Sequence, residues 1–180
     1  VKKPILILGC LQDCDLPVAA VHNLTINSCS LSYAQHVNDI LGEIGEKIDC
    51  HIKIDTGMNR TGLVARKDRY DQAVAEAKEI FALPNLSVTG IYTHFSCGDS
   101  EDPEDIVFTQ NQYDVFCDVV DRMQEDGYDV GLRHCTSTCP LLVHPEWKMD
   151  MVRVGMLGFG QSMTEEWAQK MNLHPIMRWC

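Results

Sequence analysis

The stretch HIKIDTGMNRTGL (residues 51–63) joins a short alternating segment to a turn that contains two glycines. Residues 50–55 alternate with period two, which predicts a strand with one apolar and one polar face. The polar face carries His51, Lys53 and Asp55. A polar strand face that leads into a turn with an arginine suits the mouth of a binding site. The alternative is an edge strand with one solvated face, because charged strand residues are usually solvated.

The composition is typical of a soluble globular protein, with 45% hydrophobic and 23% charged residues in a chain of 180. This length is enough for one domain with a sizeable core. No apolar run approaches the ~20 residues that cross a bilayer, and no signal peptide pattern is present. The formal net charge of -11 argues against nucleic acid and anionic membranes as partners. A small anionic substrate or cofactor would therefore need cations placed locally.

Nine cysteines are scattered along the chain, mostly inside apolar patterns. Their odd number and irregular spacing favour buried free thiols in a reducing cytoplasm over a disulfide scaffold. A zinc site is also disfavoured, because its candidate ligands lack a CxxC pair. These candidates are His134, Cys135, Cys139 and His144.

Both chain ends favour an internal piece of a longer protein. The chain begins with Val1 rather than Met, and it ends on a strand-like apolar segment, PIMRWC (residues 175–180).

Apolar strand patterns alternate with amphipathic helix patterns along the chain. Strands are predicted at 4–9, 24–27, 50–55, 88–95, 131–136 and 150–154. Helices are predicted at 32–48, 67–81 and 103–126, with short ones after Asp15, a plausible cap, and before His144. The first strand is continuously apolar and should be buried on both faces.

This alternation implies parallel strands with crossover helices. A closed (β/α)8 barrel uses about 250 residues for eight units. The predicted fold class is therefore α/β, a partial (β/α)8 TIM-like barrel with about six of the eight β/α units, and roughly 60 residues would precede Val1. An open doubly wound sheet is the alternative, although its usual glycine-rich fingerprint is missing after the first strand.

Polar residues follow four consecutive predicted strands at their carboxyl ends, where barrel active sites are assembled. They are Lys53, Arg60, His94, Ser137, Thr138, Arg153 and Gly155. We expect them to converge in one site. Taken singly, His94 could instead be a hydrogen-bonded core histidine and Arg153 a surface charge.

Four motifs over nearly the whole chain resemble signatures of the alanine racemase family, pyridoxal 5′-phosphate (PLP) enzymes built on a (β/α)8 barrel. DTGMNRTG (55–62) resembles the family's DTGMxRxG, and VTGIYTHF (88–95) resembles GIxTHF. RHCTSTCPLLVHPEW (133–147) resembles the HxANSAA segment, and MDMVRVGMLGFG (149–160) resembles MVRxGIxxYG.

The resemblance implies a role for each of these residues. His94 would pack against the cofactor ring, and Arg153 would hydrogen-bond the pyridine nitrogen, where a permanent cation disfavours ring protonation. The backbone amides of Gly155 and Met156 would hold the phosphate. Arg60 would contact the cofactor phenol and the substrate carboxylate, since its fork of donors suits a planar anion.

Three positions depart from the family pattern. Ser137 and Thr138 stand where the family has Asn-Ser. Thr138 still offers a hydroxyl to the phosphate, whereas Ser137 is shorter than asparagine. Phe159 replaces the tyrosine of the YG pair.

Lys53 matches a position that several racemases of this family carry as a carbamylated lysine. Two nearby cations, Lys53 and Arg60, should depress the lysine pKa. The neutral amine could then react with carbon dioxide and give an anion that pairs with Arg60. Alternatively, Asp55 or a bound anion neutralises Lys53 without covalent change.

The resemblance implies an isomerase that interconverts L- and D-alanine, or serine, and supplies D-amino acids for peptidoglycan. Its expected context is a cytoplasmic homodimer that needs PLP and no metal, with a membrane-anchored form left open. The alternatives are a non-catalytic PLP-binding barrel protein and a PLP decarboxylase or aldolase of the same fold.

The resemblance also implies that no catalytic residue lies in these 180 residues. The family's Schiff-base lysine would precede Val1, and its catalytic tyrosine would belong to a C-terminal β domain of the dimer partner. Residues 1–170 would form the partial PLP-binding barrel, and residues 171–180 would start that truncated β domain. Because racemisation needs an acid/base group on each side of Cα, the segment alone is expected to be inactive.

Overall fold

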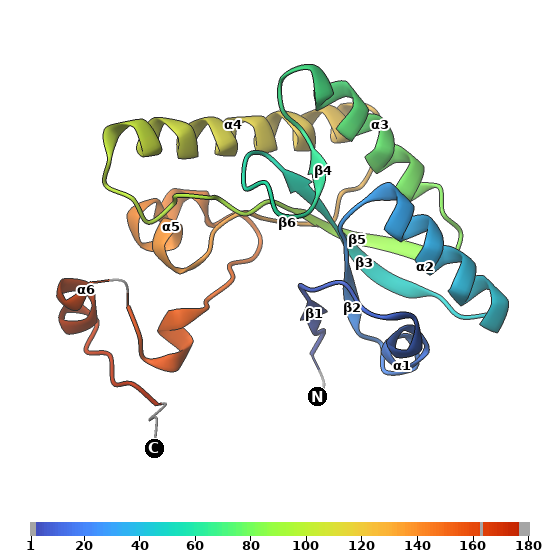
Figure 1. Ribbon diagram of the computed structural model, residues 1–180, viewed down its shortest axis with the longest axis horizontal. Coiled ribbons are helices and arrows are strands. Elements are labelled where there is room, and N and C mark those ends of the chain that lie inside the picture. The colour runs from blue at the N-terminus through green and yellow to red at the C-terminus, as the bar shows by residue number, and fades with distance from the viewer. Residues whose placement is uncertain (1–2, 163, 177–180) are drawn as a thin grey trace.

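The computed structural model describes residues 3–162 and 164–176. Five parallel strands form a sheet in the order β1-β2-β3-β5-β6, and β4 pairs with the end of β3. The strands are β1 (Leu6–Ile7), β2 (Thr25–Ser28), β3 (Ile48–Asp55), β4 (Leu63–Val64), β5 (Leu86–Tyr92) and β6 (Leu132–His134). The sheet curls, with helices along its outer side (Figure 1). This is the arrangement of part of a (β/α)8 barrel, and the predicted fold class is confirmed.

Helices connect the strands in the way that parallel pairing requires. They are α1 (Leu16–Val21), α2 (Leu31–Ile44), α3 (Tyr70–Phe81), α4 (Pro103–Glu125), α5 (Thr138–Val143) and α6 (Glu165–Lys170). Single 3-10 turns occur at Asp13–Asp15, Lys67–Arg69, Pro145–Lys148 and Met156–Phe159. Within the described residues, no helix is long and apolar enough to span a bilayer.

The helix ends follow from local chemistry. Ser30 caps α2, because its Oγ accepts a hydrogen bond from the backbone N–H of Tyr33 at 3.1 Å. Gly45 ends α2 with φ of 69°, which is why this helix stops short of the predicted residue 48. Asp102 caps α4 through the N–H of Glu104 at 2.8 Å. The predicted cap Asp15 makes no such side-chain bond.

The core lies between the sheet and the helices α2, α3 and α4. Its largest fully buried side chains include Leu41, Ile52, Ile54, Ile80 and Phe116. Burying each of these stabilises the fold by about 1.5–3 kcal/mol. The helical periods in the sequence therefore mark the faces that pack on the strands.

One predicted strand is shorter than expected and another is wrong, both at the margins of the sheet. The first forms only at residues 6–7, and Ile5 and Leu8 remain 42% and 49% exposed. β1 is an edge strand of the described sheet with β2 as its single neighbour, and Leu6 and Ile7 are only partly buried, not buried on both faces as predicted. The segment 150–154 forms no strand, because it makes only isolated bonds to the β6 side of the chain. Asp150 N donates to Arg133 O, and Arg153 N donates to Thr136 O.

Other parts of the chain also differ from the predictions. The sequence pattern did not predict the strand β4, the 3-10 turns or α6, because these short elements show no clear strand or helix period. Residues 171–176 form a turn and irregular backbone, and residues 177–180 lie outside the described residues. The domain boundary at 170 therefore stays a prediction. The eight cysteines in the described part of the chain are free, but only Cys50 and Cys135 are buried as predicted, and Cys10 and Cys14 are exposed.

Gly131, just before β6, should be intolerant of a side chain. It has φ of 64°, and an added Cβ would fall on the carbonyl of Thr89. We expect Gly131→Ala to lower the free energy of unfolding of the full-length protein by about 2–4 kcal/mol, through backbone strain and the clash. Gly127→Ala is the matched control, because Gly127 also has positive φ, 90°, but open space around it, so the cost should be about 1–2 kcal/mol. Urea denaturation of both variants checks this, and equal losses would contradict it.

Candidate active site

One cavity of about 950 Å³ opens at the carboxyl ends of the strands. Residues that follow β1, β3, β5 and β6 line it, together with the segment 153–156. The structure brings all eight predicted site residues to this cavity: Lys53, Arg60, His94, Ser137, Thr138, Arg153, Gly155 and Met156. Their roles toward a ligand stay predictions.

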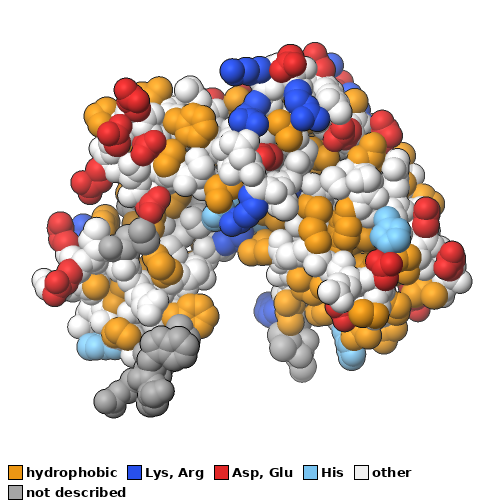
Figure 2. Space-filling model, viewed as in Figure 1, with side chains coloured by type: hydrophobic (Ala, Val, Ile, Leu, Met, Phe, Trp, Pro, Cys, Tyr) orange, Lys and Arg blue, Asp and Glu red, His pale blue; other side chains and the backbone are white. Residues whose placement is uncertain are grey.

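The cavity carries positive charge although the chain is acidic. Among the described residues, three basic side chains line it, Lys53, Arg60 and Arg153, against one acidic side chain, Asp99. The space-filling view shows a hollow with basic side chains at its inner end, while acidic side chains lie over the outer surface (Figure 2). The cavity therefore suits a small anion.

The polar face of β3 is buried. His51, Lys53 and Asp55 are only 4%, 3% and 3% exposed, so the alternative of a solvated edge strand is wrong. β3 lies between β2 and β5 in the middle of the sheet, which removes this face from water.

The turn after β3 is built by Asp55. Its carboxylate accepts hydrogen bonds from the N–H groups of Gly57 at 2.9 Å and Asn59 at 3.1 Å. Asn59 takes the left-handed conformation, with φ of 56°, and its side chain donates to the carbonyl of Gly57. This turn carries the exposed Arg60 to the rim of the cavity.

Lys53 Nζ donates to Thr61 Oγ1 at 2.9 Å, from the far side of the same turn. Burial lowers the pKa of the Lys53 ammonium, and the neighbouring Arg60 lowers it further, while Asp55 opposes them. The amine is therefore closer to its neutral, nucleophilic form than an exposed lysine.

The guanidinium of Arg153 is the most heavily bonded group in the cavity. Nη2 donates to the carbonyls of Thr93 at 2.7 Å and Cys135 at 3.0 Å, and it lies 3.2 Å from His94 Nδ1. Nη1 lies 2.6 Å from His134 Nδ1. Burial lowers the pKa of Arg153 to about 10, which leaves it cationic at neutral pH.

Two histidines extend from Arg153 into the sheet. Arginine can only donate, so His134 accepts at Nδ1 and donates from Nε2 to His51 Nδ1 at 2.9 Å. Burial, reinforced by Arg153, lowers the pKa of His134 to about 2, and burial lowers that of His51 to about 4. Both rings are therefore neutral, and the tautomer of each is set by its neighbour.

His94 is held neutral as well. Burial lowers the pKa of His94 to about 4, and Arg153 adds to the effect. A neutral imidazole at the cavity wall can pack against a flat aromatic ligand.

Sequence reasoning named His51 on the polar strand face and His134 among the candidate zinc ligands, but it missed their contact with each other and the role of Tyr92. The Tyr92 ring stacks on His134 with centroids 4.7 Å apart, and its hydroxyl donates to Asn27 at 3.0 Å. Period two along residues 88–95 places Tyr92 and His94 on one face, so the signal for Tyr92 was present. No sequence signal marked the contact between His51 and His134, because these residues lie 83 positions apart in the chain and meet only across strands.

The opposite wall of the cavity offers hydroxyl and amide groups. Gly155 N donates to Thr138 Oγ1 at 3.1 Å, and Met156 begins a 3-10 turn. Ser137, the residue before α5, makes no side-chain capping bond to that helix. These groups suit the binding of phosphate oxygens.

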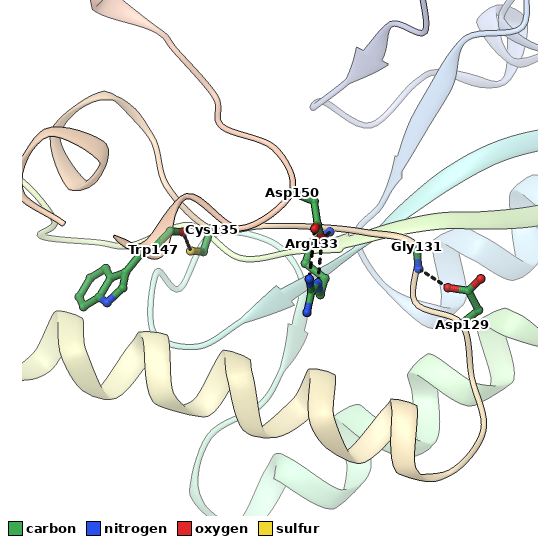
Figure 3. Close-up of polar contacts among 6 residues, drawn as sticks. All are labelled: Asp129, Gly131, Arg133, Cys135, Trp147 and Asp150. Atoms are coloured by element: carbon green, nitrogen blue, oxygen red, sulfur yellow. Dashed lines mark hydrogen bonds and ion pairs between the residues drawn. The ribbon is translucent and has the colours of Figure 1, made fainter. Parts of the chain in front are cut away.

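Contacts on the outside of β6 fix the segment that carries Arg153. Arg133 forms a two-pronged ion pair with Asp150, at 2.7 and 3.1 Å, and Cys135 Sγ donates to Trp147 O at 3.2 Å (Figure 3). Arg153 is thus anchored at its backbone as well as at its side chain.

Three of the four candidate zinc ligands are engaged elsewhere. His134 contacts His51 and Arg153, Cys135 contacts Trp147, and His144 pairs with Glu146 at 3.0 Å. In the described ranges, no group of three or more His, Cys, Asp or Glu side chains is placed to hold a metal ion.

The chain resembles alanine racemases along its whole length. Residues 1–163 match the family model "Alanine racemase, N-terminal domain". Alanine racemase of Desulforamulus reducens is 33% identical over 98% of this chain and 46% of that protein. Alanine racemase of Methanococcus maripaludis is 31% identical over 97% of this chain and 45% of that protein. The chain thus spans about half the length of these relatives.

The fold matches as well. The solved structure of Clostridium difficile 630 alanine racemase in complex with cycloserine superposes with a TM-score of 0.80 and 28% identity, over 96% of this chain and 45% of that one. A curled parallel sheet, one cationic cavity at its carboxyl ends and the match over residues 1–163 agree with one another: the chain belongs to the alanine racemase family, whose N-terminal barrel domain it represents.

Proposed function

We propose that the full-length protein is a PLP-dependent alanine racemase that interconverts L- and D-alanine. The observation that carries this proposal is Arg153, a half-buried cation fixed by two backbone carbonyls and His134 at the wall of the cavity. The family and its named relatives support the same activity.

The residues of the cavity fit PLP. A volume of about 950 Å³ is ample for a substituted pyridine ring with a phosphate. Thr138 Oγ1 and the amides of Gly155 and Met156 would hold the phosphate, with Ser137 beside them. The neutral His94 ring would pack on the flat face of the cofactor.

Arg153 would donate to the pyridine nitrogen. Its bonds to Thr93 O, Cys135 O and His134 hold the guanidinium in place, so this cation disfavours a proton on that nitrogen. When bound, PLP supplies an electron-withdrawing ring that stabilises negative charge at the substrate Cα. Arg153 would limit how far that charge is drawn into the ring.

Arg60 would bind the substrate carboxylate and the cofactor phenol oxygen from the rim of the cavity. The turn that Asp55 organises sets its position. Lys53, next to it, is proposed to be carbamylated, since its pKa is lowered and a carbamate would pair with Arg60. Asp55 or a bound anion remains the non-covalent alternative.

The remaining parts of the activity are proposed from the family. The lysine and tyrosine that exchange the Cα proton would come from outside residues 1–180, and the tyrosine from a C-terminal β domain of a homodimer partner, starting near residue 171. Supply of D-alanine to peptidoglycan in the cytoplasm, and serine as a second substrate, belong to the same proposal.

The full-length protein loaded with PLP should convert L-alanine to a racemic mixture, because the cavity supplies the cofactor and substrate anchors. The 180-residue polypeptide should show no activity above background, since both proton-transfer groups would be missing. Chiral chromatography of the products checks both, with the cofactor-free protein as control. Bound PLP without turnover would favour the non-catalytic PLP-binding protein, and faster turnover of serine would reassign the substrate.

Arg153→Glu in the full-length enzyme should lower kcat by about two orders of magnitude or more. The carboxylate cannot donate to the carbonyls of Thr93 and Cys135, and it favours a protonated pyridine nitrogen. The absorbance spectrum of bound PLP should change with it. Arg122→Glu is the matched control, because Arg122 lies exposed on α4 in an ion pair with Asp126, and its kcat should stay within about twofold. Circular dichroism verifies folding, and an unchanged rate and spectrum for Arg153→Glu would remove Arg153 from the cofactor.

Full-length protein prepared with ¹³C-bicarbonate should carry the label on Lys53, as seen by ¹³C NMR. Lys53→Ala should lose the signal and most of its activity, and acetate should restore part of that activity by replacing the carbamate charge. Lys47→Ala, at an exposed lysine, should keep both. A wild-type protein without the label, together with a fully active Lys53→Ala variant, would support the non-covalent alternative instead.

A further inference from the structure

Two cysteines face one another at the wall of the cavity. Cys10 follows β1 and Cys29 follows β2, and their Sγ atoms are 2.9 Å apart. Cys10 also lines the cavity, as Lys53 and Asn27 do. The proposed racemase chemistry does not use either thiol.

The register of the two strands explains why the thiols meet. β1 and β2 are parallel, with Leu6 opposite Thr25 and Ile7 opposite Ile26. Continuing this register by three residues places Cys10 opposite Cys29. Neighbouring strands lie about 4.8 Å apart, which is inside the range of about 4.4–6.8 Å that a disulfide needs between Cα atoms. The sulfur atoms would have to approach by only about 0.9 Å to bond.

The backbone on both sides of the pair is anchored. After Cys10, Leu11 N donates to the hydroxyl of Tyr33 at 2.9 Å. The carbonyl of Cys29 accepts from Gly62 N at 3.0 Å, and Ser30 caps α2 directly after it. Tyr33 itself lies in the first turn of α2, so both cysteines are tied to the start of the same helix. Their approach is therefore a built feature of the fold.

The two thiols differ in access. Cys10 is exposed, whereas Cys29 is partly buried. Burial raises the pKa of the Cys29 thiol, and the adjacent Cys10 raises it further. A thiol reacts as its thiolate, so Cys10 is placed to react first and Cys29 to resolve the product.

We propose that Cys10 and Cys29 form a thiol–disulfide site that a small-molecule disulfide oxidises reversibly. The Cys10 thiolate attacks one sulfur of the reagent, forms a mixed disulfide and expels one thiolate. Cys29, losing its proton, then attacks Cys10 Sγ and expels the second thiolate. The two cysteine protons end on the two released thiols, so the protein is oxidised by two electrons and the reagent is reduced by two.

The bond would close the cavity wall between β1 and β2. β1 is the edge of the described sheet and pairs with β2 over only two residues. A covalent link beyond the end of that short ladder would hold the edge strand in register, and it would fix Cys10 at the lining of the cavity.

Oxidised glutathione on the full-length protein tests the proposal. Proteolysis before aspartate separates the cysteines, because Asp13 and Asp15 lie between Cys10, Cys14 and Cys29. Mass spectrometry should find the peptides of Cys10 and Cys29 joined, with the loss of two hydrogen atoms, and dithiothreitol should separate them. This crosslink should exceed any crosslink of the exposed Cys14 by about tenfold or more, because only the first pair is in contact.

Single variants separate the two steps. Cys29→Ser should stop at a glutathione adduct on Cys10, Cys10→Ser should leave Cys29 reduced, and Cys14→Ser should behave as wild type. Circular dichroism of each variant verifies the fold. A Cys10–Cys14 or Cys14–Cys29 crosslink as the main product, or reduced Cys10 and Cys29 after full reaction of Cys14, would overturn the proposal.

Discussion

The arrangement of this site depends on the hydrogen bonds that hold the half-buried guanidinium of Arg153. A guanidinium removed from water needs acceptors, and the chain provides them at the ends of two neighbouring strands through Thr93 O, Cys135 O and His134. This requirement fixes how β5, β6 and the segment after Asp150 meet. The same requirement selects neutral histidines around the cation, since a second charge there would be repelled.

Much of the fold could be predicted because the central elements are amphipathic. The helices α3 and α4 bury one apolar face, and β3 alternates between an apolar and a polar face, both of them buried, so the periods in the sequence predict these elements. The strands predicted at the margins of the sheet are short or missing for a physical reason. Residues 4–9 and 150–154 are as apolar as a strand, but a strand needs backbone partners, and partners are a property of the whole sheet.

The residues of the site were likewise predicted only in part. Residues inside a local motif, such as Arg60 and Gly155, were expected at the cavity and lie there. The pairing of His51 with His134 depends on the register between β3, β5 and β6, which no local pattern encodes. Gly90 belongs to this pairing too, because a Cβ there would lie 2.6 Å from the His51 ring. Its missing side chain makes the space for the imidazole.

The lowered pKa values of three histidines make the stability of the fold depend on pH. His51, His94 and His134 have folded-state pKa values of about 4, 4 and 2, below the value of about 6.5 for an unfolded histidine. At a pH between these values, the histidines therefore bind protons in the unfolded chain but not in the folded chain. This contribution to stability is therefore complete above about pH 6.5, and it is lost as the pH falls toward 4 for His51 and His94 and toward 2 for His134. An interior that keeps its histidines neutral to accommodate one arginine is thereby an acid-labile interior.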